Sequence, residues 1–326
     1  MAREMMFAEA MAAAIMEEMQ RDADVVFYGQ NMAMTERDPF LKKFGRNRVR
    51  ITPISETAEI GAAVGAAMTG LRPIVELYMN EFMLVAFDQV INEAPRMRYM
   101  SGGQVKVPLV LKAGFGFAAG WAGQHSNCLY HTMMGIPGLK LALPSTPADA
   151  KGLMAAAIRD DNPVVYLHHY MLMLEKGEVP DGDFVIPFGV ADVKRAGTDV
   201  TIVATAWMVK KSLAAAEQLA REGISAEVVD PRTLAPLDVD TIVASVRKTG
   251  RLVLVDQAPR HSSAAAVIAG EVAEHGFRYL KAPVKMVTAL DTSIPYSEPL
   301  ESYVLPSEEK IVAAVKSVLS KQPVAA

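Results

Sequence analysis

One acidic residue of this sequence stands where a carboxylate can do chemistry. Glu56 ends the segment Ile51-Thr-Pro-Ile-Ser-Glu56, and a run of small residues from Gly61 to Gly70 follows it. The proline and serine before the acid are helix start signals, and glycines spaced four apart let another backbone approach the helix closely. An acid in a first turn also complements the helix dipole. Its position alone therefore leaves a purely structural role open.

A second candidate for chemistry is the histidine of Gln124-His125-Ser126, which follows a glycine-rich stretch beginning at Gly114. An imidazole titrates near neutral pH and can donate a proton to a developing oxyanion. The glycines resemble a dinucleotide-binding fingerprint, but their spacing is one residue too long and no acidic residue closes a following strand. Flexible glycines beside a cofactor pocket explain the stretch better. The alternative is structural: His125 could simply be hydrogen-bonded within a loop.

The elements that must position these residues alternate along the chain as short strand-like runs and helical runs, which is the pattern of parallel sheets with crossover helices. The expected strands cover residues 24–28, 73–77, 107–112, 140–143, 163–167, 200–204, 225–229 and 251–255, and the expected helices cover 4–20, 57–70, 82–99, 148–160, 207–222, 238–248 and 263–275. A turn-rich polar stretch at 175–183 reads as a linker. The sequence predicts an α/β protein of two three-layer αβα domains, residues 1–185 and 186–326.

Composition narrows the class of protein. The chain has 326 residues, of which 51% are hydrophobic and 21% charged, and this balance is typical of globular proteins. A net charge of −4 gives no electrostatic reason to expect nucleic acid or an anionic membrane as partner. The acidic start lacks the pattern of a signal peptide, no apolar run is long enough to span a bilayer, and a single cysteine, Cys128, excludes an internal disulfide. We therefore expect a cytoplasmic location.

Many segments match one known family, in order and with its spacing, from about residue 5 to residue 318. The chain resembles the beta subunits of thiamine-diphosphate-dependent 2-oxo acid dehydrogenases and acetoin dehydrogenases, which are relatives of transketolase. The matching segments include Ile51–Glu56, Gly70–Pro73, Asp88–Asn92, Arg98–Gly103, Gln124–Ser126, Ile136–Lys140, Pro144–Pro147, Ala157–Asp160, Asn162–Val165, Asp230–Asp238 and Lys248–Gly250. The resemblance implies a pyrimidine-binding domain followed by a transketolase C-terminal-like domain.

The resemblance gives roles to individual residues. Glu56 matches the acid that hydrogen-bonds the pyrimidine ring of thiamine diphosphate and so activates the cofactor, and Phe82 matches the aromatic residue that packs on that ring. Ile54 and Gln89, on matching segments, complete the expected cofactor-binding set. His125 matches a histidine on the substrate side of the cofactor, where it serves the substrate or a lipoyl group.

The same resemblance implies two metal ions, potassium and magnesium. Backbone carbonyls around the end of the helix at 148–160 are expected to hold a potassium ion, since hard cations prefer oxygen ligands. The residues concerned are Leu109, Ala157, Ile158, Asp160 and Asn162. The Gly-Asp-Gly motif that holds magnesium and the cofactor's diphosphate in this class has no match in the chain. We therefore expect an alpha subunit to hold magnesium, in an α2β2 heterotetramer that this chain contacts through residues 61–70 and 82–92.

The substrate is less well defined than the reaction class. Gln30, Met79 and Val85 stand where relatives usually carry other residues, and residues 256–263 and 280–288 are nearer to acetoin dehydrogenases than to pyruvate dehydrogenases. The expected reaction is cleavage of a 2-oxo acid or acyloin and transfer of the fragment to a lipoyl acyltransferase. A split transketolase-like chain without a lipoyl partner is one alternative, and a non-catalytic scaffold or regulatory subunit is another.

Overall fold

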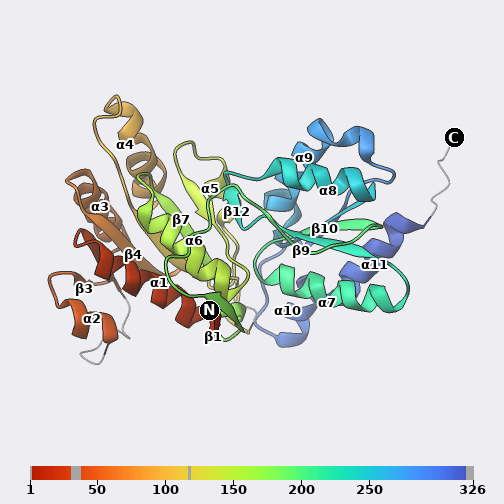
Figure 1. The fold of residues 1–326 in the computed structure, drawn as a ribbon, viewed down its shortest axis with the longest axis horizontal. Helices are drawn as coiled ribbons and strands as arrows, with labels where there is room; N and C mark the ends of the chain where they lie inside the picture. The colour runs from red at the N-terminus through yellow and green to blue at the C-terminus, as the bar shows by residue number, and fades with distance from the viewer. Residues whose placement is uncertain (1, 31–37, 117–118, 321–326) are drawn as a thin grey trace. The chain divides into compact units, whose positions relative to one another are not determined.

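The computed structural model describes residues 2–30, 38–116 and 119–320, which form two compact units (Figure 1). The first unit comprises Met1–Gly116 and Thr132–Phe188, and the second comprises Phe117–His131 and Gly189–Ala326. The short segment that carries His125 is therefore grouped with the C-terminal residues, although it lies within the N-terminal half of the sequence. The boundary drawn from sequence, between residues 185 and 186, stays a prediction.

The strands of the first unit form a parallel sheet in the order β6-β7-β5-β4-β2-β3. Their bounds are β2 (Val25–Gly29), β3 (Val49–Ile51), β4 (Arg72–Met79), β5 (Val110–Phe115), β6 (Lys140–Ala142) and β7 (Val164–His169). Every residue of β5 and β7 is buried, as the central strands of a parallel sheet covered on both faces should be. The predicted α/β class is confirmed.

The predicted helices at 4–20, 57–70 and 148–160 are found within about three residues of their expected bounds, whereas short helical elements such as the one at 39–44 were not predicted. The helical elements are α1 (Phe7–Arg21), α2 (Pro39–Phe44), α3 (Glu56–Met68), η1 (Asn80–Ala86), η2 (Gln89–Glu93), α4 (Ala94–Met100), α6 (Pro147–Arg159) and η3 (Tyr170–Leu172), together with α5 (Tyr130–Met134), which begins in the second unit. Residues 82–99 are helical throughout, as predicted, but they do not form one regular α-helix, because the segment contains the 3₁₀ helix η1 and the π-helical η2 before α4. Pro95 lacks the N–H that a continuous α-helix would need there.

A two-stranded antiparallel ribbon also departs from the prediction. β1 (Ala2–Met6) pairs with β8 (Lys176–Pro180) along five residues of each strand. The predicted helix from residue 4 and the predicted linker at 175–183 are thus partly wrong. The ribbon pairs residues far apart in sequence, and such tertiary pairing overrides local propensity. It places α1 against α6, where Arg159 Nη2 bonds to the buried carboxylate of Glu18 at 2.6 Å.

The second unit is built on a five-stranded sheet in the order β14-β13-β10-β11-β9, in which only β9 runs antiparallel to its neighbour. The strands are β9 (Asp192–Arg195), β10 (Val200–Ala204), β11 (Ala226–Asp230), β13 (Leu252–Pro259) and β14 (Lys285–Ala289), with the short β12 (Thr233–Ala235) in addition. The helical elements are α7 (Trp207–Arg221), α8 (Val239–Thr249), η4 (Arg260–Ser262), α9 (Ala264–His275), η5 (Phe277–Tyr279), α10 (Glu298–Val304) and α11 (Glu308–Leu319).

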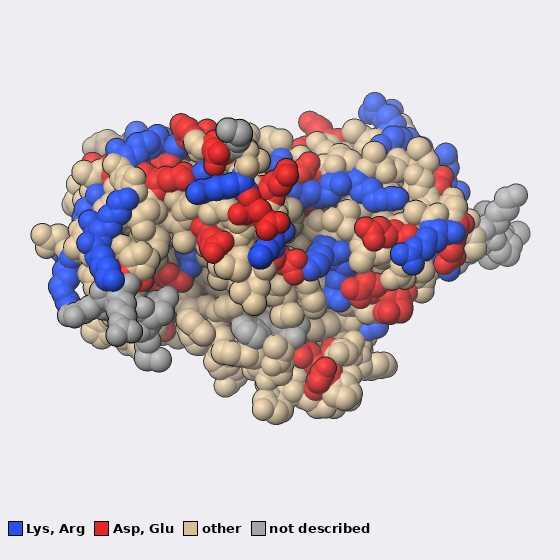
Figure 2. All heavy atoms as spheres, turned by 60° about the horizontal axis from the view of Figure 1, so that its bottom comes forward, with Lys and Arg blue, Asp and Glu red and all other residues tan. Residues whose placement is uncertain are grey.

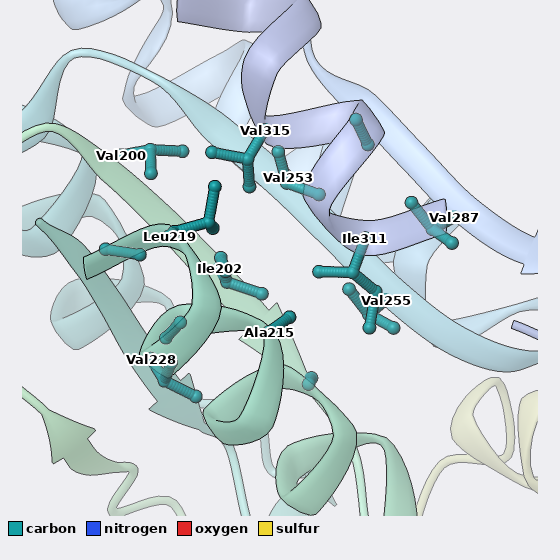
Figure 3. Close-up of a cluster of buried hydrophobic side chains, with 14 of the residues drawn as sticks. Val200, Ile202, Ala215, Leu219, Val228, Val253, Val255, Val287, Ile311 and Val315 are labelled. Carbon is teal, nitrogen blue, oxygen red and sulfur yellow. The ribbon is translucent and has the colours of Figure 1, made fainter. Parts of the chain in front are cut away.

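Two apolar clusters on opposite faces of this sheet make it the middle of three layers. On one face, side chains of β10, β11 and β13 pack against α7 and α11, with Leu219, Ile311 and Val315 directed toward the strands (Figure 3). On the other face, Val203 and Leu254 pack with residues of α8 and α9 such as Ile242 and Ile268. Strand residues alternate between the two clusters, because successive side chains point to opposite faces.

Candidate active site

Glu56 is the first residue of α3, and its side chain is largely withdrawn from water. Ser55 precedes the helix with an extended φ of −164° and makes no side-chain capping bond. Glu56 is 8% exposed. Within the part of the chain that the structure describes, its carboxylate has no hydrogen-bond or ion-pair partner. A carboxylate so placed is available to an atom that this chain does not supply, since buried polar groups are normally paired.

A second acid, Glu59, lies one turn further along α3 and was not singled out from the sequence. It is 4% exposed, accepts a hydrogen bond from Gln30 Nε2 at 3.0 Å, and accepts another from the Thr52 hydroxyl. Burial raises the pKa of Glu59 above its ordinary value and the charge of Glu56 acts in the same direction, while the two bonds oppose the rise. Two acids three residues apart at a helix start were the signal for this pair.

Residues of η1 and η2 expected to contact the cofactor lie against the first turns of α3. The Thr57 hydroxyl donates to the Val85 carbonyl at 3.0 Å, and Gln89 Cγ is 3.6 Å from the position that a Cβ on Gly61 would take. Phe82, on η1, is half-buried. The structure thus brings together the elements that carry Glu56, Phe82 and Gln89.

Ile54 lies next to the same helix start but is 76% exposed. It shares this exposure with three other apolar residues of the segments around α3 and η1, namely Ile51 at 49%, Leu84 at 52% and Val85 at 65%. We call these four residues the α3–η1 apolar surface. Gly65, on the exposed side of α3, has no atom within 4 Å of where a Cβ would be. Exposed apolar residues on segments that neighbour a candidate site suit an interaction surface.

The other two positions where the sequence departs from its relatives differ in environment. Met79, at the end of β4, is fully buried, whereas Val85 belongs to the α3–η1 apolar surface. Gln30, as described above, bonds to Glu59. The three departures therefore differ in effect: Met79 packs in the core, Val85 is exposed, and Gln30 bonds to a buried acid.

His125 belongs to the second unit. Its backbone N–H donates to the Ala122 carbonyl at 3.3 Å, and its ring packs edge-on to Trp121 with the centroids 5.9 Å apart. Ala122 adopts a positive φ of 60°, which marks a tight turn before the histidine. The candidate catalytic groups are thus distributed over two units, with Glu56 on the first and His125 on the second.

The carbonyls expected to hold potassium lie at the end of α6, and a guanidinium group already contacts two of them. Arg72 donates from Nε to the Ile158 carbonyl at 2.9 Å and from Nη2 to the Asp160 carbonyl at 2.7 Å. The Leu109 and Ala157 carbonyls accept backbone N–H bonds from Val164 and Asp160. Since a carbonyl oxygen has two lone pairs, these bonds leave room for a cation, and potassium at this turn stays a prediction.

Side chains at the same turn are tied by further charges. Lys140 pairs with the Asp160 carboxylate, Arg98 donates to the Asn162 side-chain oxygen at 2.7 Å, and Lys106 pairs with Asp161 at 2.7 Å. Lys106 chiefly, with Arg72 assisting, holds the pKa of Asp161 below its usual range. The turn is therefore strongly held by this chain's own cations.

The described residues contain neither a cluster of metal-ligating side chains nor a helix that could cross a membrane. No three His, Cys, Asp or Glu side chains of the described ranges gather as they would around a metal ion. No described helix has the length and apolarity that crossing a membrane requires. On the face shown in Figure 2, acidic and basic side chains are interspersed.

Comparison with known proteins agrees with this architecture. Residues 3–174 match the family model described as the transketolase pyrimidine binding domain, and residues 189–311 match the transketolase C-terminal domain. Over 96% of this chain and 97% of the other, the fold is similar to that of a solved structure titled "Split gene transketolase, inactive beta4 tetramer", with a TM-score of 0.79 and 25% identity. The fold is thus that of two transketolase-type domains.

Sequence relatives define the family more closely. The chain is 42% identical to the beta subunit of the acetoin:2,6-dichlorophenolindophenol oxidoreductase of Bacillus subtilis, over 98% of this chain and 99% of the relative. The corresponding subunit of Cupriavidus necator is 44% identical over 98% of each chain. The pyruvate dehydrogenase E1 beta subunit of Rhizobium meliloti is 43% identical over 96% of this chain and 69% of the relative. The chain belongs to the beta subunits of thiamine-diphosphate-dependent 2-oxo acid and acetoin dehydrogenases.

Proposed function

We propose that this chain works with an alpha subunit, as an α2β2 heterotetramer, to cleave a 2-oxo acid or acyloin and to pass the acyl fragment to a lipoyl group on a partner acyltransferase. The observation that carries this proposal is the state of Glu56. It is a buried acid at a helix start, it has no hydrogen-bond or ion-pair partner among the described residues, and neighbouring segments carry exposed apolar residues such as Ile54.

The residues present fit half of a thiamine diphosphate site. When bound, the cofactor supplies a thiazolium carbon that becomes a nucleophile once it loses its proton. Glu56 would hold a proton against the pyrimidine ring nitrogen, and its small exposure would keep that proton from exchanging with water. Phe82 would pack on the ring, with Ile54 and Gln89 beside it, and His125 would donate a proton to the substrate or to the lipoyl sulfur.

The other half of the site would come from the alpha subunit. Magnesium needs oxygen ligands, commonly carboxylates, and the described residues offer no cluster that could hold it. The α3–η1 apolar surface and the open space beside Gly65 suit a contact with another chain. Magnesium and the diphosphate would thus be bound by the alpha subunit, and the pyrimidine by this chain.

Substitution of Glu56 tests the chemical assignment. Glu56→Gln keeps the size of the side chain but removes the acid, so cofactor should still bind in the assembled enzyme, while exchange of the thiazolium proton slows by orders of magnitude. Exchange is measured by NMR after quenching the enzyme in acid. Glu59→Gln is the matched control, because it lies on the same helix and already has two hydrogen-bond donors. Normal exchange in Glu56→Gln would refute the assignment.

Assembly is tested separately by enlarging Gly65. A Cβ there has no atom of this chain within 4 Å and Gly65 is exposed, so the isolated chain should fold normally, but a leucine side chain would fill the space that the alpha subunit needs. Association with the alpha subunit, followed by analytical ultracentrifugation, should weaken at least tenfold, which is about 1.4 kcal/mol. Gly270→Leu, at another open helical position in the second unit, is the control. Equal affinity for Gly65→Leu and the unmodified chain would exclude this surface as the interface.

The likeness to a split transketolase favours one alternative, a carbon–carbon transferase that needs no lipoyl partner. The two functions differ in their acceptor. The assembled enzyme is therefore assayed with pyruvate and with acetoin, using lipoamide as one acceptor and an aldehyde as the other. Turnover with the aldehyde and none with lipoamide would establish the transferase instead. A purely scaffolding subunit would show no loss of activity in Glu56→Gln.

A further inference from the structure

The segment that carries His125 is bonded at both of its ends to buried carboxylates of the second unit. We call residues 120–130 the His125 loop. Its first residue, Gly120, bonds to Glu301 of α10, and its last residue, Tyr130, bonds to Asp256 of β13. All of these residues belong to the second unit.

The bond at the Tyr130 end is wholly buried. Tyr130 is 0% exposed, and its hydroxyl donates to Asp256 Oδ1. Asp256 also accepts the backbone N–H groups of Ala258 at 2.9 Å and Ala265 at 3.1 Å, so its carboxylate is fixed by the strand end and by the start of α9. Burial raises the pKa of Tyr130 well above its ordinary value, which keeps the phenol protonated as the donor.

The bond at the Gly120 end is also made to a buried acid. The Gly120 N–H donates to Glu301 Oε2 at 3.2 Å, and Glu301 is 4% exposed. Burial raises the pKa of Glu301, whose second oxygen has no hydrogen-bond partner among the described residues. Gly120 has a φ of 74°, and a Cβ there would be 3.3 Å from the Tyr296 carbonyl oxygen. A side chain at Gly120 would therefore be strained and crowded.

Contacts among the inner residues of the loop hold its turn and place an aromatic ring against the imidazole. The Asn127 side chain donates to the Gly123 carbonyl, and the His125 N–H donates to the Ala122 carbonyl at 3.3 Å. The Trp121 ring lies against the His125 ring. Because both ends of this short loop are bonded to the second unit, a displacement of either end would move the backbone that carries His125.

We propose that Asp256 and Glu301 are positioning residues that fix the His125 loop on the C-terminal unit, so that the Tyr130–Asp256 and Gly120–Glu301 bonds set the place of the His125 imidazole. This proposal rests on the proposed role of His125 in transfer to the lipoyl group. Neither carboxylate touches the substrate in this scheme. Each acts through the loop.

Tyr130→Phe is the sharpest test of activity, because it removes one oxygen atom and leaves the ring packed. In the assembled enzyme, reduction of 2,6-dichlorophenolindophenol with pyruvate or acetoin should change by less than about twofold, while transfer to lipoamide falls roughly tenfold. Tyr166→Phe is the matched control, since that buried hydroxyl donates to Ala150 in the first unit and should leave both rates unchanged.

A double substitution separates this proposal from the function on which it rests. If Tyr130 acts through His125, Tyr130→Phe should cause no further loss of the rate of transfer to lipoamide in a His125→Ala background. Additive losses would overturn the positioning role. If His125→Ala itself does not slow transfer to lipoamide, the proposed catalytic role of His125 is rejected. The anchoring of the loop by Asp256 and Glu301 is then tested by the fluorescence of the loop alone.

Trp121 provides that second readout, because the chain has only one other tryptophan, Trp207. In a Trp207→Phe background, assembled with an alpha subunit whose tryptophans are replaced by non-fluorescent 4-fluorotryptophan, Tyr130→Phe and Glu301→Ala should increase quenching of Trp121 by acrylamide about twofold as the loop loosens. Glu301→Gln should restore the original quenching, since its amide oxygen still accepts the Gly120 N–H. Unchanged quenching in both Tyr130→Phe and Glu301→Ala would overturn the proposal.

Discussion

Arg72 should be the residue of the first unit whose loss most clearly loosens the turn after α6. Its guanidinium reaches from β4 to that turn and makes three contacts, to the Ile158 carbonyl at 2.9 Å, the Asp160 carbonyl at 2.7 Å and Asp161 Oδ1 at 3.3 Å. The Arg72 side chain is 19% exposed, so its bonds to carbonyls are only weakly screened by water. Arg72→Ala removes all three contacts at once.

The size of the effect follows from these contacts. Hydrogen bonds from a charged donor contribute about 1.5 kcal/mol or more each, so the two carbonyl contacts together give about 3 kcal/mol. The Asp161 side chain is 38% exposed, and its ion pair adds less than about 1 kcal/mol. We therefore expect Arg72→Ala to lower the free energy of unfolding of the first unit by about 3 kcal/mol. Arg72→Lys should recover only part of it, because an ammonium cannot make the forked contact.

Urea unfolding followed by circular dichroism measures this free energy, provided that the transition of the first unit is resolved from that of the second. Arg96→Ala is the control, since Arg96 is exposed on α4 and its removal should change stability by less than about 0.5 kcal/mol. If Arg72→Ala changes stability no more than Arg96→Ala does, the contacts to the turn are not stabilising and the reasoning is wrong.

Three further perturbations have definite expected outcomes. Burial raises the folded-state pKa of Glu59, so the stabilisation by its protonated form is complete below the ordinary glutamate pKa near 4.5 and is lost as pH rises through the folded-state pKa. The urea midpoint of unfolding should therefore fall with rising pH in this window. In Glu59→Gln the midpoint should depend less on pH over the same window. Gly29→Ala should lower the free energy of unfolding by more than about 2 kcal/mol, because the added Cβ would overlap the Glu76 carbonyl oxygen of the neighbouring strand. Gly223→Ala, at a φ of 79° but with no atom nearby, should lower it by only about 1 kcal/mol. Chemical denaturation measures both values. If the carbonyls after α6 bind potassium, KCl should raise the midpoint of the first unit above that in choline chloride at equal ionic strength, and equal midpoints would exclude the ion.

The sheets could be predicted from the sequence because their strands are short buried runs. The run at 200–204 coincides with β10, and 163–167 falls on β7 within two residues, since a continuous apolar run between turn residues has few other uses in an α/β protein. The β1–β8 ribbon could not be predicted in this way. Its polar residues carry no alternation, and it forms only because the chain returns after β7.

The candidate site was predictable in part for the same kind of reason. Glu56 is marked by local signals at a helix start, and the structure places it there. Glu59 and its bond to Gln30 depend on a contact across 29 residues, and the anchoring of the His125 loop depends on Tyr130 and Asp256, 126 residues apart. No local pattern encodes such pairs, because a buried carboxylate finds its donors only after the fold has formed.

The first turns of α3 combine two features that a chain acting alone would not be expected to keep. A buried carboxylate without a hydrogen-bond partner is costly, and exposed apolar side chains such as Ile54 and Val85 gain nothing from contact with water. Glu59, three residues from Glu56, shows that the same helix can satisfy a buried acid fully with residues of this chain. Among the residues that the structure describes, the lack of a partner is therefore specific to Glu56 rather than a property of the helix. Contact with a cofactor at Glu56 and with an alpha subunit over the α3–η1 apolar surface would remove both costs together, so cofactor and alpha subunit should each strengthen the binding of the other.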